Sequence, residues 1–376
     1  MRALFAAGLL LAALLAMRAP ANAIPIFAQR YALSCEACHT VLPELNAFGN
    51  AFRDRGYRLP GVPRHGTTVV ALRYNLEWQS DPAPGSRRFT PSSSLLADED
   101  IGAINAFLHY GLGVDGSPSK PFLGFLSYYA ERLRTLFRLG LYELPLPHSP
   151  VQRLDDVTTY GYEGTTVGQN DLALNAPRLG LETERTFGAT RLAASLAFGE
   201  FKGAAYGGAP VDDGTRTVAA APELGLFASG PLVPWLTLNA QALEGVRSIA
   251  LPGRLPFHDA YTRLGLGFGT AFFRQMLQLD AQQWLGRDGD ADGSGDPLNS
   301  SGGYVRLKYF ATSHFYVATR YDAQAAPFAT RDVVFYVGTF VTKHARIVLQ
   351  QTNNLLGGKP SYSGEFIVGV PWPLRE

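Results

Sequence analysis

The 376 residues include 33 basic and 32 acidic side chains, a near-neutral balance that excludes the clustered basic excess of a nucleic-acid-binding protein. Only two cysteines occur, which excludes a disulfide framework. Hydrophobic residues make up 46% of the chain, yet after Met17 no stretch is long and apolar enough for a transmembrane helix, so any membrane crossing must use strands.

Residues 1–23 have the order of a secretory signal peptide. The basic Arg2 precedes an apolar run from Leu4 to Met17, and small residues follow up to Ala23. The apolar run is shorter than the roughly 20 residues that a membrane-spanning helix needs. We therefore expect cleavage after Ala23 and export from the cytoplasm.

The sequence Cys35-Glu36-Ala37-Cys38-His39 matches the C-x-x-C-H attachment motif of c-type haem. Thiols at this spacing can form thioethers to the haem vinyl groups, and the adjacent histidine then serves as the proximal iron ligand. A redox C-x-x-C pair or half of a zinc site is the alternative, but the sequence has neither a surrounding βαβ pattern nor two further zinc ligands. We predict one covalent haem c on Cys35, Cys38 and His39.

The residues after the motif have helical spacing. Leu45, Phe48 and Phe52 would form one apolar face of a short helix, which could pack on the porphyrin, on protein, or on both. The predicted haem segment, residues 24–65, is too small to bury a haem alone. We therefore expect the cofactor to contact the rest of the chain.

The sixth haem ligand is open at the level of sequence. His65 is the nearest candidate and is taken as the tentative distal ligand, while His109 is a second. Met276, the only methionine that remains after signal cleavage, is distant in sequence. A five-coordinate iron is also compatible with these residues.

From Thr67 onward the hydrophobic pattern has a period of two. Apolar and polar residues alternate over 70–79, 104–112, 236–242, 277–282 and 305–309. Such strands fit either a soluble sandwich or propeller, or an outer-membrane barrel whose apolar face contacts lipid.

Connection lengths favour the barrel. Short turns near residues 187, 233, 273, 312 and 342 alternate with long polar or glycine-rich connections at 81–101, 203–221, 245–259 and 285–302. The polar strand face carries many charges, which a wet lumen would tolerate: Arg73, Glu77, Arg138, Glu182, Arg306, Lys308 and Arg320. Aromatic residues near strand ends would form a girdle: Tyr74, Trp78, Tyr110, Trp235, Trp284, Tyr309 and Tyr321.

The predicted fold is therefore mainly β. A small α-helical c-type haem segment precedes an antiparallel transmembrane β-barrel, residues 66–376, of about 14–16 strands in contact with outer-membrane lipid. If the short turns face the periplasm, a strand at 121–131 runs outward and one at 172–185 runs inward. No strand or two strands then lie between them, and the pattern over 132–171 does not decide.

The loop Asp288-Gly289-Asp290-Ala291-Asp292-Gly293 matches the opening of a calcium loop. The twelfth position is Asn299 instead of the expected glutamate, and no helices are predicted on either side. An acidic, solvated external loop is the better interpretation.

A resemblance supports the same architecture. The chain resembles the fused outer-membrane monohaem cytochrome-porins of iron-oxidising bacteria, through the haem motif, Ile24-Pro25-Ile26-Phe27-Ala28, Pro43-Glu44-Leu45, Phe48-Gly49, Phe52 and Gly56-Tyr57 before a long β region. The resemblance implies a haem segment on the periplasmic side of an outer-membrane barrel or within it. It also implies electron transfer from an extracellular donor, such as Fe(II), to periplasmic cytochromes or other carriers.

Two other functions remain open. The barrel could be a diffusion porin that the haem segment plugs or gates. Alternatively, the chain could be a soluble periplasmic haem enzyme or sensor on a β scaffold. No Ser-His-Asp or paired-carboxylate constellation stands out in the sequence. As an electron-transfer protein, the chain could act as an Fe(II)-oxidising cytochrome, whereas a five-coordinate iron that binds small gases or peroxide would support the haem enzyme or sensor.

Overall fold

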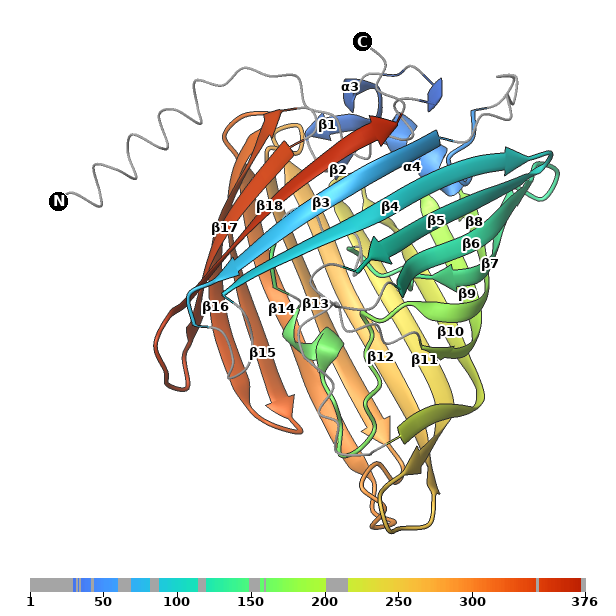
Figure 1. Cartoon of the computed structure of the whole chain (residues 1–376), viewed down its shortest axis with the longest axis vertical. Coiled ribbons are helices and arrows are strands. Elements are labelled where there is room, and N and C mark those ends of the chain that lie inside the picture. The colour runs from blue at the N-terminus through green and yellow to red at the C-terminus, as the bar shows by residue number, and fades with distance from the viewer. Residues whose placement is uncertain are drawn as a thin grey trace.

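The computed structural model describes residues 30–31, 33, 35–41, 44–59, 69–81, 88–113, 120–148, 156–158, 160–200, 216–342 and 345–372. Within these ranges, an N-terminal segment lies at one mouth of a closed antiparallel barrel of sixteen strands (Figure 1). The predicted fold class is confirmed. The predicted signal peptide and His65 lie outside the described residues. No helix of the described chain is long and apolar enough to cross a membrane.

The N-terminal segment contains α3 (Cys35–Cys38), β1 (His39–Val41), β2 (Glu44–Leu45) and α4 (Ala47–Asp54). Each barrel strand pairs with its sequence neighbours, and the last strand pairs with the first to close the barrel. In order, the strands are β3 (Val69–Gln79), β4 (Phe89–Ile101), β5 (Ile104–Leu112), β6 (Lys120–Ala130), β7 (Thr135–Tyr142), β8 (Arg178–Phe187), β9 (Thr190–Glu200), β10 (Arg216–Val233), β11 (Leu236–Ala250), β12 (Phe257–Phe272), β13 (Leu277–Asp288), β14 (Leu298–Phe310), β15 (Phe315–Ala326), β16 (Thr330–Thr342), β17 (Ala345–Asn354) and β18 (Ser361–Trp372).

Period-two alternation separates the two faces of the wall, as predicted. In β14, Val305, Leu307 and Tyr309 point outward and expose 43–48% of their surface. Between them, Arg306 and Lys308 point inward and are buried. The outer wall is therefore apolar and the lumen is charged, which is the arrangement of a membrane barrel and the inverse of a soluble core.

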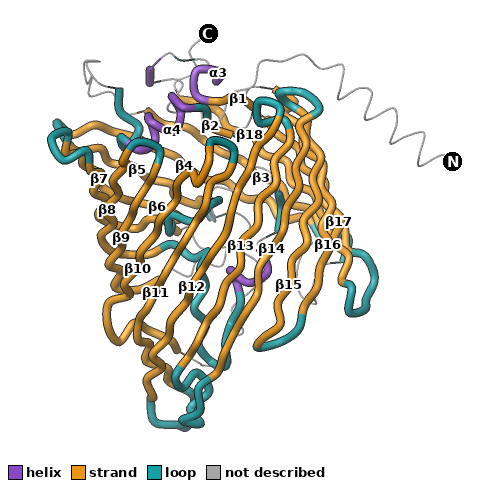
Figure 2. Tube along the Cα trace, turned by 180° about the vertical axis from the view of Figure 1, so that it is seen from behind, coloured by secondary structure: helices purple, strands orange, loops and turns teal. Residues whose placement is uncertain are grey.

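The two ends of the barrel differ. The short turns lie at the end where β3 begins and β18 ends, beside α3 and α4, and we call this the short-turn end (Figures 1 and 2). The opposite end carries the longer connections and is called the long-loop end. One strand, β7, lies between β6 and β8, so the prediction of none or two was wrong. Its premise failed because β6 runs toward the short-turn end, not away from it.

Several strands extend into stretches that were predicted as loops. β10 begins at Arg216 and β11 continues to Ala250, where the two strands are still paired. Similarly, β13 reaches Asp288 and pairs there with Leu298 of β14. Polar and glycine residues at these positions remain in strands because the wall supplies cross-strand partners for their backbone groups.

The described residues of the connection between β7 and β8, namely 143–148, 156–158 and 160–177, lie in the lumen and are called the inner segment. It contains the short 3-10 helix η1 (Gly161–Gly164), which contacts β14 and β15 and lies within the barrel outline in both views (Figures 1 and 2). Trp284, predicted in an aromatic girdle, instead points inward, is 1% exposed and stacks on Tyr162 of this segment. Tyr309 is exposed on the outside, as a girdle requires, whereas Trp235 lies in the turn between β10 and β11 and borders the lumen cavity described below.

Candidate functional site

The helix α4 is built onto the backbone of the C-x-x-C-H motif. Asn46 caps α4 by accepting a hydrogen bond from Gly49 N, at 2.9 Å. Its own backbone N–H donates to the Cys38 carbonyl at 2.8 Å, and its Nδ2 donates to the Ala37 carbonyl at 3.1 Å. A Cβ on Gly49 would lie 2.1 Å from the Cys38 carbonyl oxygen, so only glycine permits this close packing.

The predicted short helix is confirmed, but its apolar face differs from the prediction. Phe52 is buried and makes edge contacts with Tyr31 and Tyr57, with ring centroids 5.4 and 5.6 Å apart. Phe48 is 42% exposed, and Leu45 belongs to β2 instead of the helix. Burial of Tyr31 in this cluster raises the pKa of its hydroxyl, which therefore stays protonated at neutral pH.

Ion pairs fasten the N-terminal segment to the rim of the barrel. Arg30 pairs with Asp98 and with Asp100 of β4, the latter at 2.7 Å. Arg58 donates to Asp100 at 2.7 Å and to the Ala103 carbonyl at 2.6 Å. All these charged groups are almost fully buried, and Asn105 donates to both carboxylates. On another part of the rim, the Thr186 hydroxyl donates to Asp54 of α4 at 3.1 Å.

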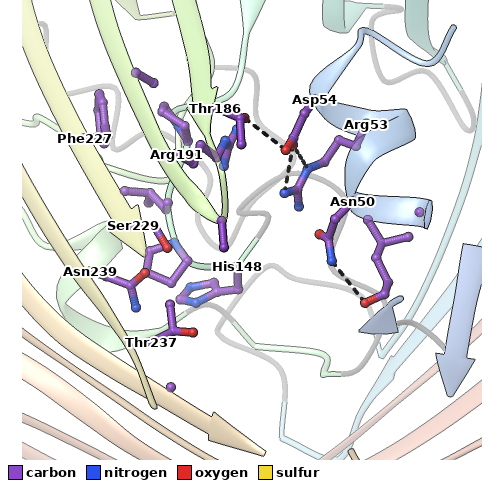
Figure 3. A pocket seen from close by; sticks show the side chains of 18 of the residues that line it. Asn50, Arg53, Asp54, His148, Thr186, Arg191, Phe227, Ser229, Thr237 and Asn239 are labelled. Atoms are coloured by element: carbon purple, nitrogen blue, oxygen red, sulfur yellow. Dashed lines mark hydrogen bonds and ion pairs between the residues drawn. The ribbon is translucent and has the colours of Figure 1, made fainter. Parts of the chain in front are cut away.

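A cavity of about 1300 Å³ lies in the lumen against this segment. Figure 3 shows Asn50, Arg53 and Asp54 of α4 on one side, with Thr186, Arg191 and His148 facing them. Cys38 and Phe52 also line the cavity. Arginines outnumber acids among its described lining residues, with Arg53, Arg55, Arg134, Arg138, Arg191, Arg274 and Arg306 against Asp54, Glu143 and Asp280. Four of these arginines pair with carboxylates, namely Arg53 with Asp54, Arg138 with Glu182, Arg191 with Glu184 and Arg306 with Asp280. The lining therefore carries a small positive excess.

An aromatic cluster from the inner segment and the wall forms another part of the cavity lining. His148 stacks on Tyr160 with ring centroids 3.8 Å apart, and its Nδ1 lies 3.1 Å from the Tyr304 hydroxyl. Its Nε2 lies 2.9 Å from a carboxylate oxygen of Glu163. The Arg320 guanidinium lies 4.1 Å from the Tyr160 ring centroid. Both imidazole nitrogens thus face protein groups.

Buried charges join the inner segment to the wall. Arg320 bonds Asp156 at 2.6 Å and Asp322 at 2.9 Å, and all three side chains are almost fully buried. Asn170 donates to Asp259 at 2.6 Å and to Asp288 at 3.1 Å. Because unpaired buried charges are strongly unfavourable, these pairs hold the segment in one position.

The acidic loop at 288–293 was predicted to be solvated, and for Asp288 this was wrong. Asp288 is fully buried and also pairs with Arg263 at 2.9 Å. Its burial follows from the extension of β13 and from contact with the inner segment, which the sequence pattern does not reveal. In the described part of the chain, no group of His, Cys, Asp and Glu side chains is arranged to hold a metal ion.

The predicted haem residues lie next to one another in the fold. Cys35 and Cys38 begin and end α3, and His39 begins β1. The Cys38 side chain is half-buried, and burial raises the pKa of its unmodified thiol. The side chains of Cys35 and His39 lie outside the described residues.

Neither distant candidate for the sixth ligand lines the cavity. His109 is buried in the wall, with Nε2 3.0 Å from the Ser94 hydroxyl and its ring against Phe122. Met276 packs beside the cluster around Phe310. Among the described residues, the histidine that lines the cavity is His148, which no strand pattern or motif in the sequence marks.

Comparison with known proteins shows the fold. No protein-family model and no curated protein sequence matches the chain. Similar solved structures include an anion-selective porin from Comamonas acidovorans, with TM-score 0.57, 13% identity, and coverage of 82% of this chain and 100% of that one. The outer-membrane channel DcaP of Acinetobacter baumannii has a TM-score of 0.55 and 9% identity, and the match covers 84% of this chain and 99% of that one. OmpT of Vibrio cholerae in its trimer form has a TM-score of 0.53 and 10% identity, and the match covers 82% of this chain and 99% of that one. The chain has the fold of outer-membrane porins.

Proposed function

We propose that this chain is an outer-membrane cytochrome-porin. One haem c, attached through Cys35 and Cys38 with His39 as proximal ligand, transfers electrons between an extracellular donor, such as Fe(II), and periplasmic cytochromes or other carriers. The observation that carries the proposal is the position of Cys38. It borders a cavity of about 1300 Å³ inside a porin-type barrel, at the mouth where the haem-motif segment is fastened by buried ion pairs.

The membrane location is supported by the wall itself. Its outward side chains are apolar along the strands, and its ends have the short-turn and long-loop asymmetry of bacterial outer-membrane barrels. In such barrels the short turns face the periplasm. The haem segment would then lie on the periplasmic side, within reach of soluble carriers.

The described residues fit the cofactor. The one-turn helix α3 separates the two cysteines, and Gly49 lets α4 pack closely against the motif backbone. Arg55, Arg134 and Arg274 of the lining would provide positive charge for the two carboxylates that a haem carries. When bound, the haem supplies one-electron chemistry whose potential depends on its ligands, burial and hydrogen bonds. The protein's own contribution is to attach the group, to balance its charge and to limit its contact with water.

The first test is fractionation of cells that produce the protein, followed by haem staining of denatured outer-membrane protein. We expect covalent haem in the outer-membrane fraction of the wild type and none in Cys35→Ala. When intact cells are then supplied with Fe(II), the haem absorbance spectrum should change from that of the oxidised haem to that of the reduced haem. Absence of covalent haem from the wild type would refute the proposal, and haem only in the soluble periplasm would favour the soluble enzyme or sensor.

A second function, a diffusion channel, is favoured by the likeness to porins. One similar structure is an anion-selective porin, and the cavity here is rich in arginine. Solute passage would require a water path beside the inner segment. Conductance in a planar bilayer that is unchanged between oxidised and reduced haem would support this function over electron transfer.

A further inference from the structure

An apolar groove of about 650 Å³ runs along the outer wall across β8 to β12. Large side chains project from the wall around it, namely Phe187, Leu192, Leu226, Leu264 and Leu266, which are 43–68% exposed. Between them the outward positions are small, namely Ala194, Ala228, Ala240 and Ala242. The groove therefore arises because alanines alternate with leucines on neighbouring strands.

Strand register places one cation at the end of this groove. Cross-strand pairs form a row from Arg185 through Leu192, Ala228 and Ala240 to Leu266. Arg185 is exposed, and its guanidinium carbon lies 4.4 Å from the Phe187 ring centroid. Among the described residues, no carboxylate pairs with Arg185. The guanidinium is thus held on an aromatic ring with its hydrogen-bond donors available.

Arg185 also lies at a particular depth. It is close to the end of β8, at the short-turn end, where an outward arginine is far less unfavourable than at the bilayer midplane. The outward cations Arg287 and Arg331 lie near the opposite ends of their strands, at the long-loop end. The groove thus has a cation at the depth of one lipid headgroup region, and its apolar part continues from there toward the bilayer midplane.

We propose that this groove binds one anionic phospholipid of the periplasmic leaflet. The phosphate pairs with Arg185, and an acyl chain lies between the leucines over the alanine positions. Charge complementarity selects a phosphate-bearing lipid, and the depth of Arg185 selects the leaflet. The assignment to the periplasmic leaflet rests on the barrel orientation in the proposed function, whereas the groove and its cation do not depend on haem.

Native mass spectrometry of the purified, delipidated full-length protein tests the site, with phosphatidylglycerol as the probe. Because a charged hydrogen-bonded contact contributes about 1.5–3 kcal/mol, Arg185→Gln should weaken retention by about tenfold or more. Ala240→Phe should fill the groove and also reduce retention. Arg287→Gln is the matched control and should retain lipid like the wild type. Diacylglycerol, which lacks the phosphate, should bind wild type and Arg185→Gln equally.

Equal phosphatidylglycerol retention by wild type and Arg185→Gln would overturn the proposal. So would an oligomer that Ala240→Phe disrupts while no lipid binds, since a second copy of the chain would then occupy the groove. Covalent haem and barrel assembly are measured on the same variants. If haem is not attached, lipid retention can still be measured, and if lipid is not retained, covalent haem can still be detected. The two proposals can therefore be refuted independently of each other.

Discussion

Asp100→Asn should undock the N-terminal segment while leaving the barrel folded. Asp100 forms an ion pair with Arg30 at 2.7 Å and accepts hydrogen bonds from Arg58 at 2.7 Å and from Asn105 at 3.2 Å, and its side chain is 4% exposed. Removing one partner of a buried ion pair costs about 3–5 kcal/mol, because the other charge stays desolvated. The ratio of docked to undocked segment should therefore fall by roughly two to four orders of magnitude.

Hydrogen exchange of residues 44–59 measures this ratio, because exchange of protected amides follows the free energy of local opening. We expect much faster exchange there in Asp100→Asn, while β10 to β14 exchange as in the wild type. Asp332→Asn is the matched control, since Asp332 also lies on a barrel strand but at the long-loop end. Slow exchange of residues 44–59 in Asp100→Asn would show that these ion pairs do not hold the segment.

Three further substitutions test the site and the lumen. Gly49→Ala introduces a methyl group 2.1 Å from the Cys38 carbonyl, so α4 must shift at a cost of about 1–3 kcal/mol, and we expect reduced covalent haem by staining. Cys38→Ser should weaken or abolish haem staining and leave the heat-dependent gel mobility of the folded barrel unchanged, because Cys38 lies outside the wall. Arg320→Met leaves Asp156 and Asp322 buried without their cation, so we expect about 3–5 kcal/mol of destabilisation and increased single-channel conductance.

The wall was predictable from sequence because its two environments impose a period of two. The alternation of Leu277, Leu279 and Ala281 with Gln278 and Gln282 correctly assigned inward and outward faces in β13. The same parity places Trp284 inward, but its residue type suggested a lipid interface instead. For Trp284, the residue type thus suggested the outer face of the wall, whereas its position in the alternating pattern correctly indicated the inner face.

The inner segment was not predictable in the same way, because its position depends on partners that are distant in sequence. Asp156 meets Arg320, and Asn170 meets Asp288, across separations that no local pattern encodes. Lumen charges therefore suggested a wet pore, whereas many of them pair with one another or with the inner segment. His148 was missed for the same reason, since only the folded lumen brings it to the cavity.

This pairing bears on the choice between electron and solute transfer. A solute must displace or pass the inner segment, which buried ion pairs hold against β14 and β15. An electron needs no such opening, and its haem would lie in the cavity on the short-turn side of that segment. Arg320→Met separates the two functions, because loosening the segment should raise conductance but leave reduction of the haem by external Fe(II) possible. If conductance is already high in the wild type and unchanged in Arg320→Met, the segment is no barrier and a diffusion channel becomes the better function.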